Sequence, residues 1–142
     1  MMETNSPILA PVIALAIWTL VMWLWMYATR IPAMGAAKVD FTPGVYTNDD
    51  LKKLPVKVQW QADNYNHLHE APTVFYAVAI TLALIGGGEG INLTLAWAYV
   101  GLRVVHSIWQ STINIVPLRF LLFTLSTIVL GWLTVNTALL VF

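Results

Sequence analysis

The 142-residue sequence contains no cysteine. The protein therefore has no disulfide framework and no thiol of its own to act as a nucleophile. Charged side chains are also scarce, at 10% of the residues, and the formal net charge is zero. A chain without a basic surface lacks the electrostatic footprint of nucleic-acid binding, so we expect no nucleic-acid partner.

Apolar residues take the place of the missing charges. They make up 58% of the chain, and the mean hydropathy of +0.71 lies outside the range of ordinary soluble domains. Four segments are long and apolar enough to be transmembrane helices, at about residues 8–29, 57–86, 91–114 and 118–142. We therefore predict an all-α integral membrane protein, with residues 1–142 forming a single transmembrane domain that folds as an antiparallel up-and-down four-helix bundle.

The positions of the basic residues predict the orientation in the membrane, because short loops rich in Lys and Arg stay in the cytoplasm. Five of them lie between the first two spans: Arg30, Lys38, Lys52, Lys53 and Lys57. Arg119 follows the turn between the last two spans, whereas the N-terminus and the loop at residues 86–90 have none. We expect a cytoplasmic loop at residues 31–56 and periplasmic N- and C-termini. The protein would lie in a bacterial inner membrane, where lipid contacts its outer surface.

The predicted cytoplasmic loop contains one local folding signal. Thr47 and Asp50 have the spacing of a capping box, in which two residues at a helix start bond each other's backbone. This pattern predicts one short surface helix. An alternative role for the loop is a lid over a site on the cytoplasmic side.

Polar residues in the second and third spans recur at spacings of three and four, which places each set on one helix face. The second span carries Asp63, Asn66, His67 and Glu70. The third carries Arg103, His106, Ser107, Gln110 and Asn114. Neither stripe can face lipid, so each must face protein, water or a ligand.

The two stripes also match in depth. With a rise of about 1.5 Å per residue, Glu70 lies roughly 20 Å and Arg103 roughly 17 Å from the cytoplasmic helix ends. We therefore predict a buried ion pair between Glu70 and Arg103, with His67 opposite His106 and Asp63 opposite Gln110. The alternative is that Glu70 or Arg103 contacts a bound ligand directly.

The histidines and carboxylates of the two stripes could also indicate a metal-binding site. Histidines and carboxylates three residues apart on bundle helices are typical of di-metal proteins, and His67, His69, Glu70 and His106 supply such groups. His69, however, lies about 100° away from the stripe on an α-helix. Too few ligands converge, and we predict no metal.

Three short motifs resemble the MAPEG family, the membrane-associated proteins of eicosanoid and glutathione metabolism. They are Arg103-Val-Val-His106-Ser in the third span, Pro117-Leu-Arg119 at the start of the fourth, and the stretch from Asn66 through Glu70 and Pro72 to Phe75 in the second. Their order, the four spans and the polar loop after the first span agree with the family, so the likeness covers nearly the whole chain.

The resemblance implies a homotrimer that binds glutathione between neighbouring subunits on the cytoplasmic side. The catalytic residue implied is Arg119, which would stabilise the glutathione thiolate. The residues implied in glutathione binding are Asn66, Glu70, Arg103, His106 and Gln110. The chemistry is reasonable, since a thiol with an ordinary pKa near 8.5 is acidified by a nearby cation and a helix N-terminus.

Two functions follow as hypotheses. The first is a glutathione-dependent transferase or peroxidase acting on hydrophobic electrophiles that enter from the bilayer. The second is a non-catalytic accessory or scaffold subunit, with Arg119 as an anchor at the membrane surface. It is motivated by Asp63 and Gln110, which stand where the family's enzymes have an arginine and a tyrosine. A proton or ion pathway along the stripes is disfavoured, because the predicted ion pair would plug it.

Overall fold

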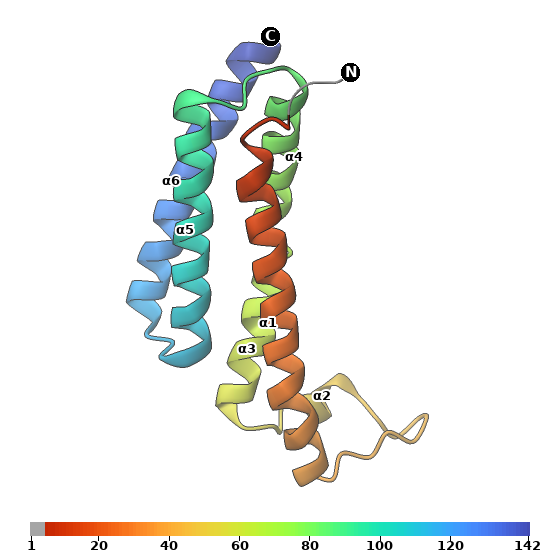
Figure 1. The fold of residues 1–142 in the computed structure, drawn as a ribbon. Coiled ribbons are helices and arrows are strands. Elements are labelled where there is room, and N and C mark those ends of the chain that lie inside the picture. Colours follow the sequence, from red (N-terminus) through yellow and green to blue (C-terminus); the bar gives the residue numbers. More distant parts are fainter. Residues whose placement is uncertain (1–4) are drawn as a thin grey trace.

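A computed structural model describes residues 5–142, which form helices joined by turns and loops. The helices are α1 (Leu9–Ala36), α2 (Asn48–Leu51), α3 (Val56–His67), α4 (Ala71–Leu84), α5 (Gly90–Thr112) and α6 (Val116–Val141). Figure 1 shows α1 lying along α3 and α4, and α5 lying along α6, with the start of α1 and the end of α6 at the same end of the molecule. No strand occurs in the described part of the chain, and the all-α prediction is confirmed.

Two helices, α1 and α6, are long and apolar enough to cross a membrane, with mean hydropathies of 2.0 and 1.8. In a soluble protein, helices this apolar would be buried in the core. Here only 28% and 17% of their most apolar stretches are buried. Their apolar side chains face outward, as they must where the surrounding solvent is lipid, and these helices support an integral membrane protein.

The prediction of one continuous helix at residues 57–86 is wrong, because this segment forms two helices. The first, α3, ends at His67, and Glu70 adopts a non-helical φ of −95° and ψ of −96° before α4 begins. Pro72 explains the interruption, since its ring has no N–H to donate and clashes with the carbonyl group four residues earlier. The predicted four helices are therefore replaced, in residues 5–142, by six that include the loop helix α2.

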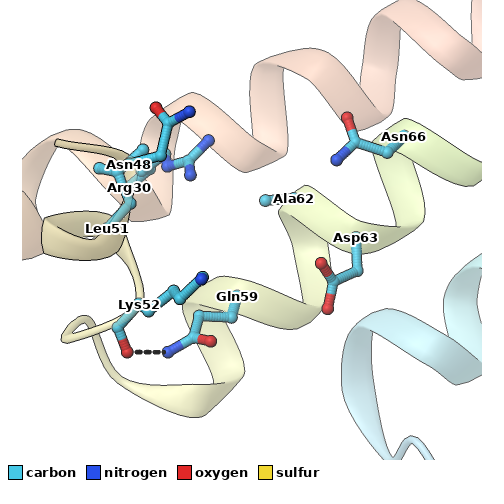
Figure 2. Close-up of a pocket in the computed structure, with 8 residues that line it drawn as sticks. All are labelled: Arg30, Asn48, Leu51, Lys52, Gln59, Ala62, Asp63 and Asn66. Carbon is cyan, nitrogen blue, oxygen red and sulfur yellow. Dashed lines mark hydrogen bonds between the residues drawn. The ribbon is translucent and has the colours of Figure 1, made fainter.

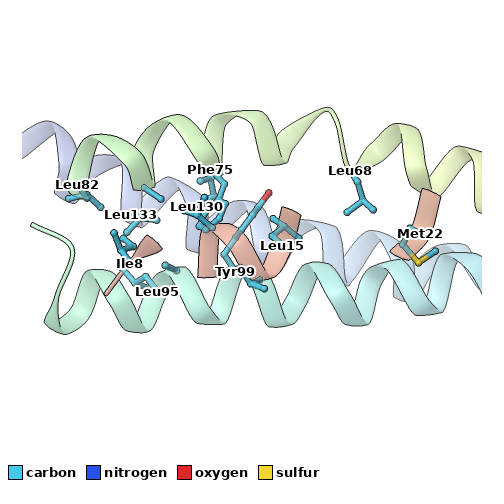
Figure 3. Packing of buried hydrophobic residues seen from close by; sticks show 14 residues of the cluster. Ile8, Leu15, Met22, Leu68, Phe75, Leu82, Leu95, Tyr99, Leu130 and Leu133 are labelled. Atoms are coloured by element: carbon cyan, nitrogen blue, oxygen red, sulfur yellow. The ribbon is translucent and has the colours of Figure 1, made fainter. Parts of the chain in front are cut away.

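The hydrophobic core joins α1, α4, α5 and α6 (Figure 3). At its centre the rings of Phe75 and Tyr99 stack with their centroids 4.7 Å apart, and Leu15 and Leu133 are fully buried around them. Along α5, buried residues up to Val100 are mostly apolar, whereas those from Arg103 onward are polar. The bundle therefore has an apolar half near the chain ends and a polar half near the 37–55 loop.

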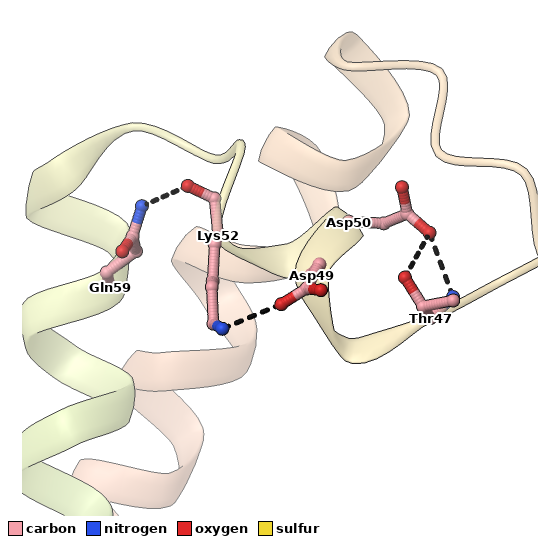
Figure 4. Close-up of polar contacts among 5 residues, drawn as sticks. All are labelled: Thr47, Asp49, Asp50, Lys52 and Gln59. Carbon is pink, nitrogen blue, oxygen red and sulfur yellow. Dashed lines mark hydrogen bonds and ion pairs between the residues drawn. The ribbon is translucent and has the colours of Figure 1, made fainter.

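The loop helix α2 is held by the capping interactions that the sequence predicts. The Thr47 backbone N–H donates to Asp50 Oδ2 at 2.9 Å, and Lys52 pairs with Asp49 at 2.6 Å (Figure 4). Gln59 in α3 donates to the Lys52 carbonyl oxygen at 2.8 Å. The short helix is confirmed, and it is tied to the start of α3.

Acidification is expected to release the start of α2. Hydrogen bonds from the Lys53 ammonium group and then from the Thr47 N–H hold the pKa of Asp50 below its ordinary value of 3.8. A lowered pKa means that the stabilisation is present above about pH 4 and is lost as the pH falls through the lowered pKa. The protection of the Thr47 amide against hydrogen exchange should follow this loss. An Asp50→Ala variant should lack the protection at neutral pH, whereas Asp49→Ala should retain it; equal loss in both would contradict the assignment.

Candidate functional site

Hydrogen bonds between buried side chains hold α3 against α5 in the polar half. Asn64 Nδ2 donates to Ser107 Oγ at 2.6 Å, and Gln61 Nε2 donates to the Ser111 carbonyl oxygen at 3.3 Å. Gln61 Oε1 also accepts a hydrogen bond from Thr29 of α1 at 3.2 Å. Because three helices meet through these amides, the position of α3 is fixed.

The polar stripe predicted to face inward on the second span is on the wrong side of α3. Gln61, Asn64 and Leu68 are buried, whereas the stripe residues Asp63, Asn66 and Glu70 are exposed. Both sets have helical spacing, and the structure buries the neutral amides because burying a carboxylate costs far more. On α5 the prediction is confirmed: the buried polar residues include Arg103, His106, Ser107 and Gln110.

The predicted ion pair between Glu70 and Arg103 does not form. Arg103 is fully buried, and its Nη2 donates to the His67 carbonyl oxygen at 3.2 Å. Glu70 has a side chain that is 65% exposed, and it contacts the His67 ring instead. The reason is the interruption of the helix after His67. Glu70 therefore does not lie opposite Arg103, and the Arg103 cation instead caps the negative C-terminal end of α3.

The rest of the predicted ladder is only partly present. Asp63 is exposed while Gln110 is buried, so these two do not face each other. His67 and His106 do meet, edge to face, with ring centroids 6.5 Å apart. The guanidinium group of Arg103 also lies 5.9 Å from the centre of the Phe123 ring, a cation–π contact that adds α6 to the cluster.

A cavity of about 190 Å³ opens where the end of α3, the middle of α5 and the start of α6 converge. Its lining residues are His67, His106, Val116, Arg119, Phe120 and Phe123. One guanidinium group and two imidazoles thus share a small space with two phenyl rings. Such a cavity suits a ligand that has both an anionic and an apolar part.

The arginine of this cavity is held by the turn between α5 and α6. Pro117 occupies the first turn of α6, where its missing N–H costs nothing. Asn114 adopts a positive φ of 54°, a conformation that asparagine tolerates better than most residues, and its Oδ1 accepts a hydrogen bond from Arg119 Nη1 at 2.7 Å. Within residues 5–142, no carboxylate lies within 4.0 Å of Arg119. The guanidinium group is therefore oriented by a neutral amide, and its charge is left for a ligand.

A second, more polar pocket of about 240 Å³ lies between the loop, α1 and α3 (Figure 2). Its lining includes Arg30 and Lys52 as well as Asp63 and Asn66. Residues of α2 form part of its wall, which is the position that the lid alternative for the loop requires. Asn66 is thus in this pocket and not beside Arg119.

The structure therefore gathers only some of the predicted site residues. Arg119 and His106 share the cavity, Arg103 and Gln110 are buried between helices, and Glu70 lies outside. Sequence reasoning did not select His67, Phe120 or Phe123 as site residues. For His67 a signal exists, since it precedes Glu70 by three residues; the phenylalanines look like any other residues of an apolar span.

A buried polar interface and a cationic cavity lie within an apolar helical bundle, and the outward-facing apolar helices support a membrane protein. Residues 8–139 match the model of the MAPEG family, and the chain belongs to that family. No curated protein and no solved structure matches the chain. The protein is thus a MAPEG-type integral membrane protein.

Proposed function

We propose that the protein is a glutathione-dependent transferase or peroxidase that acts on hydrophobic electrophiles. The observation that carries the proposal is the guanidinium group of Arg119, which has no carboxylate partner in the described chain and opens onto a cavity with aromatic walls. The layout of Arg103, His106, Pro117 and Arg119 further supports a likeness, within the family, to microsomal prostaglandin E synthase.

The proposed chemistry is stabilisation of a thiolate. A thiol has an ordinary pKa near 8.5, and both a cation and a helix N-terminus favour its ionised form. Arg119 and the start of α6 supply these two features at one place. The thiolate could then attack an electrophilic carbon or reduce a peroxide, while Phe120 and Phe123 contact the apolar part of the second substrate.

A homotrimer is the assembly that we propose. Asn66 and Glu70 belong to the polar stripe of the second span and have exposed side chains, and at membrane depth they cannot be left facing lipid. A neighbouring subunit with glutathione between the two would cover them. In this arrangement Glu70 and His106 contact glutathione beside Arg119, Asn66 lies in the other pocket, and the buried Arg103 holds α5 against the end of α3.

The proposed orientation follows from the same arrangement. The start of α1 and the end of α6 lie at one end of the bundle, and the loop helix α2 lies at the other (Figure 1). The basic residues of the loop favour the cytoplasm. We propose periplasmic termini and a glutathione site on the cytoplasmic side of a bacterial inner membrane.

Binding and turnover by the wild-type protein test this function. Protein purified in detergent should be stabilised against heat by millimolar glutathione in a saturable manner, and it should conjugate glutathione to an electrophilic aromatic substrate. Oxidised glutathione, which has no thiol, is the matched control. Absence of both effects, with co-purification of a larger membrane complex, would support the accessory or scaffold subunit instead.

A further inference from the structure

A histidine and a carboxylate stand together at the edge of the Arg119 cavity. We propose that His67 is the base that removes the thiol proton of glutathione and that Glu70 positions it. This inference rests on the proposed function and assigns a second reacting group to the same site. The cation of Arg119 stabilises a thiolate, but it has no lone pair with which to take the proton.

The contact with Glu70 determines which ring nitrogen of His67 is free. Glu70 Oε2 lies 3.2 Å from His67 Nδ1. An ionised carboxylate only accepts hydrogen bonds, so in the neutral ring Nδ1 carries the proton and Nε2 keeps the lone pair. His67 and Glu70 are three residues apart, a spacing at which two side chains can meet.

The backbone of His67 is fixed from the opposite side. Arg103 Nη2 donates to its carbonyl oxygen at 3.2 Å, and the Asn64 and Ser107 hydrogen bond holds the preceding turn of α3 against α5. A base must be held near its proton donor to be effective. The buried polar interface thus has a task that its sequence pattern alone does not reveal.

Charged and titratable groups surround His67 on several sides. Glu70 lies on its own side, His106 faces it from α5, and Arg119 lines the same cavity from α6. Arg103 is next to its backbone. The carboxylate of Glu70 is therefore in place to pair with the imidazolium that forms when the ring accepts the proton.

In the addition of glutathione to an epoxide, His67 takes up one proton and returns it. The S–H bond breaks, the proton moves to His67 Nε2, and the electron pair stays on the sulfur beside Arg119. The thiolate forms a C–S bond while the epoxide C–O bond breaks. The resulting alkoxide takes the proton back from Nε2. Glutathione and the epoxide are the only reactants.

Replacement of His67 by alanine tests the step. The kcat for epoxide conjugation should fall about 100-fold or more, the range expected for loss of a general base, while the KM for glutathione stays within about twofold, because Arg119 remains. Added imidazole should restore part of the activity. His69→Ala is the matched control, since the His69 ring bonds the Tyr65 carbonyl oxygen at 2.9 Å and does not line the cavity; it should behave like the wild type and should not respond to imidazole.

A spectroscopic measurement separates the positioning role of Glu70 from simple loss of activity. Nitrogen NMR of the wild type should show the neutral His67 ring protonated at Nδ1, and Glu70→Ala, which removes the acceptor, should abolish this preference. If His67→Ala has wild-type kcat while Arg119→Ala is inactive, the proton acceptor is wrong and the proposed function stands. If the wild type never conjugates glutathione, both fall. A folded His67→Ala protein that imidazole does not rescue would also overturn the inference.

Discussion

Replacing Arg119 by alanine is expected to lower kcat/KM for glutathione conjugation about 100- to 1,000-fold, the usual cost of removing one charge-stabilising donor from an active site. The guanidinium group is the charge that we assign to the thiolate, and no carboxylate lies within 4.0 Å of it in residues 5–142. The fraction of bound glutathione present as thiolate, measured by its ultraviolet absorbance, should fall in parallel. Thermal stability should change little, because among the residues that the structure describes the side chain hydrogen-bonds only to Asn114.

Three further variants test separately the positive charge at residue 119, the hydrogen bond that orients its guanidinium group, and the position of the cation in this cavity. Arg119→Lys keeps the charge and should retain more activity than the alanine variant. Asn114→Gly keeps the positive φ of the turn and the guanidinium group but removes the hydrogen bond, so the loss should be intermediate. Arg30→Ala removes a cation that lines the other pocket and should leave the thiolate absorbance unchanged. Equal rates for wild type and Arg119→Ala would remove the mechanism and favour the membrane-surface anchor.

Replacing Phe75 by alanine is expected to destabilise the protein by about 3 to 5 kcal/mol, as for other large-to-small changes in a packed core. Phe75 has no exposed surface, and its ring stacks on that of Tyr99. Packing matters especially within a bilayer, where lipid tails are as apolar as the core and tight contact becomes a main source of helix association. Reversible unfolding in mixed micelles would measure the loss.

A matched control for the core substitution is Phe120→Ala. Phe120 is 68% exposed, so its removal leaves no closed void, and the free energy of unfolding should change by less than about 1 kcal/mol. Similar losses in the free energy of unfolding for Phe75→Ala and Phe120→Ala would show that the two rings are equally well packed in the assembled protein. That result would contradict the placement of Phe75 alone in the core.

The long apolar spans and the loop helix could be predicted because each depends on nearby residues. The capping of α2 needs only Thr47 and Asp50, which are three positions apart. The inward face of α5 was also predictable, since Arg103, His106 and Gln110 fall on one face of an uninterrupted helix. Local spacing is sufficient wherever the backbone stays regular.

The partner of Arg103 could not be predicted from spacing, because helical spacing places Glu70 opposite Arg103 only if the second helix is continuous. Pro72 was visible in the sequence, but the backbone turn that it causes falls at Glu70, two residues earlier. That turn removes the carboxylate from the ladder. The cavity could not be predicted for a related reason. It forms where three helices meet, and the residue pattern of one helix does not show where its neighbours lie.

The interruption between α3 and α4 lies at the junction between the apolar half and the polar half of the bundle. The hydrogen bonds of Gln61 and Asn64 fix α3 on one side of this interruption. The stacked rings of Phe75 and Tyr99 fix α4 on the other side. Separate contacts therefore determine the directions of the two helices, so the polar interface and the apolar core need not share one helix axis.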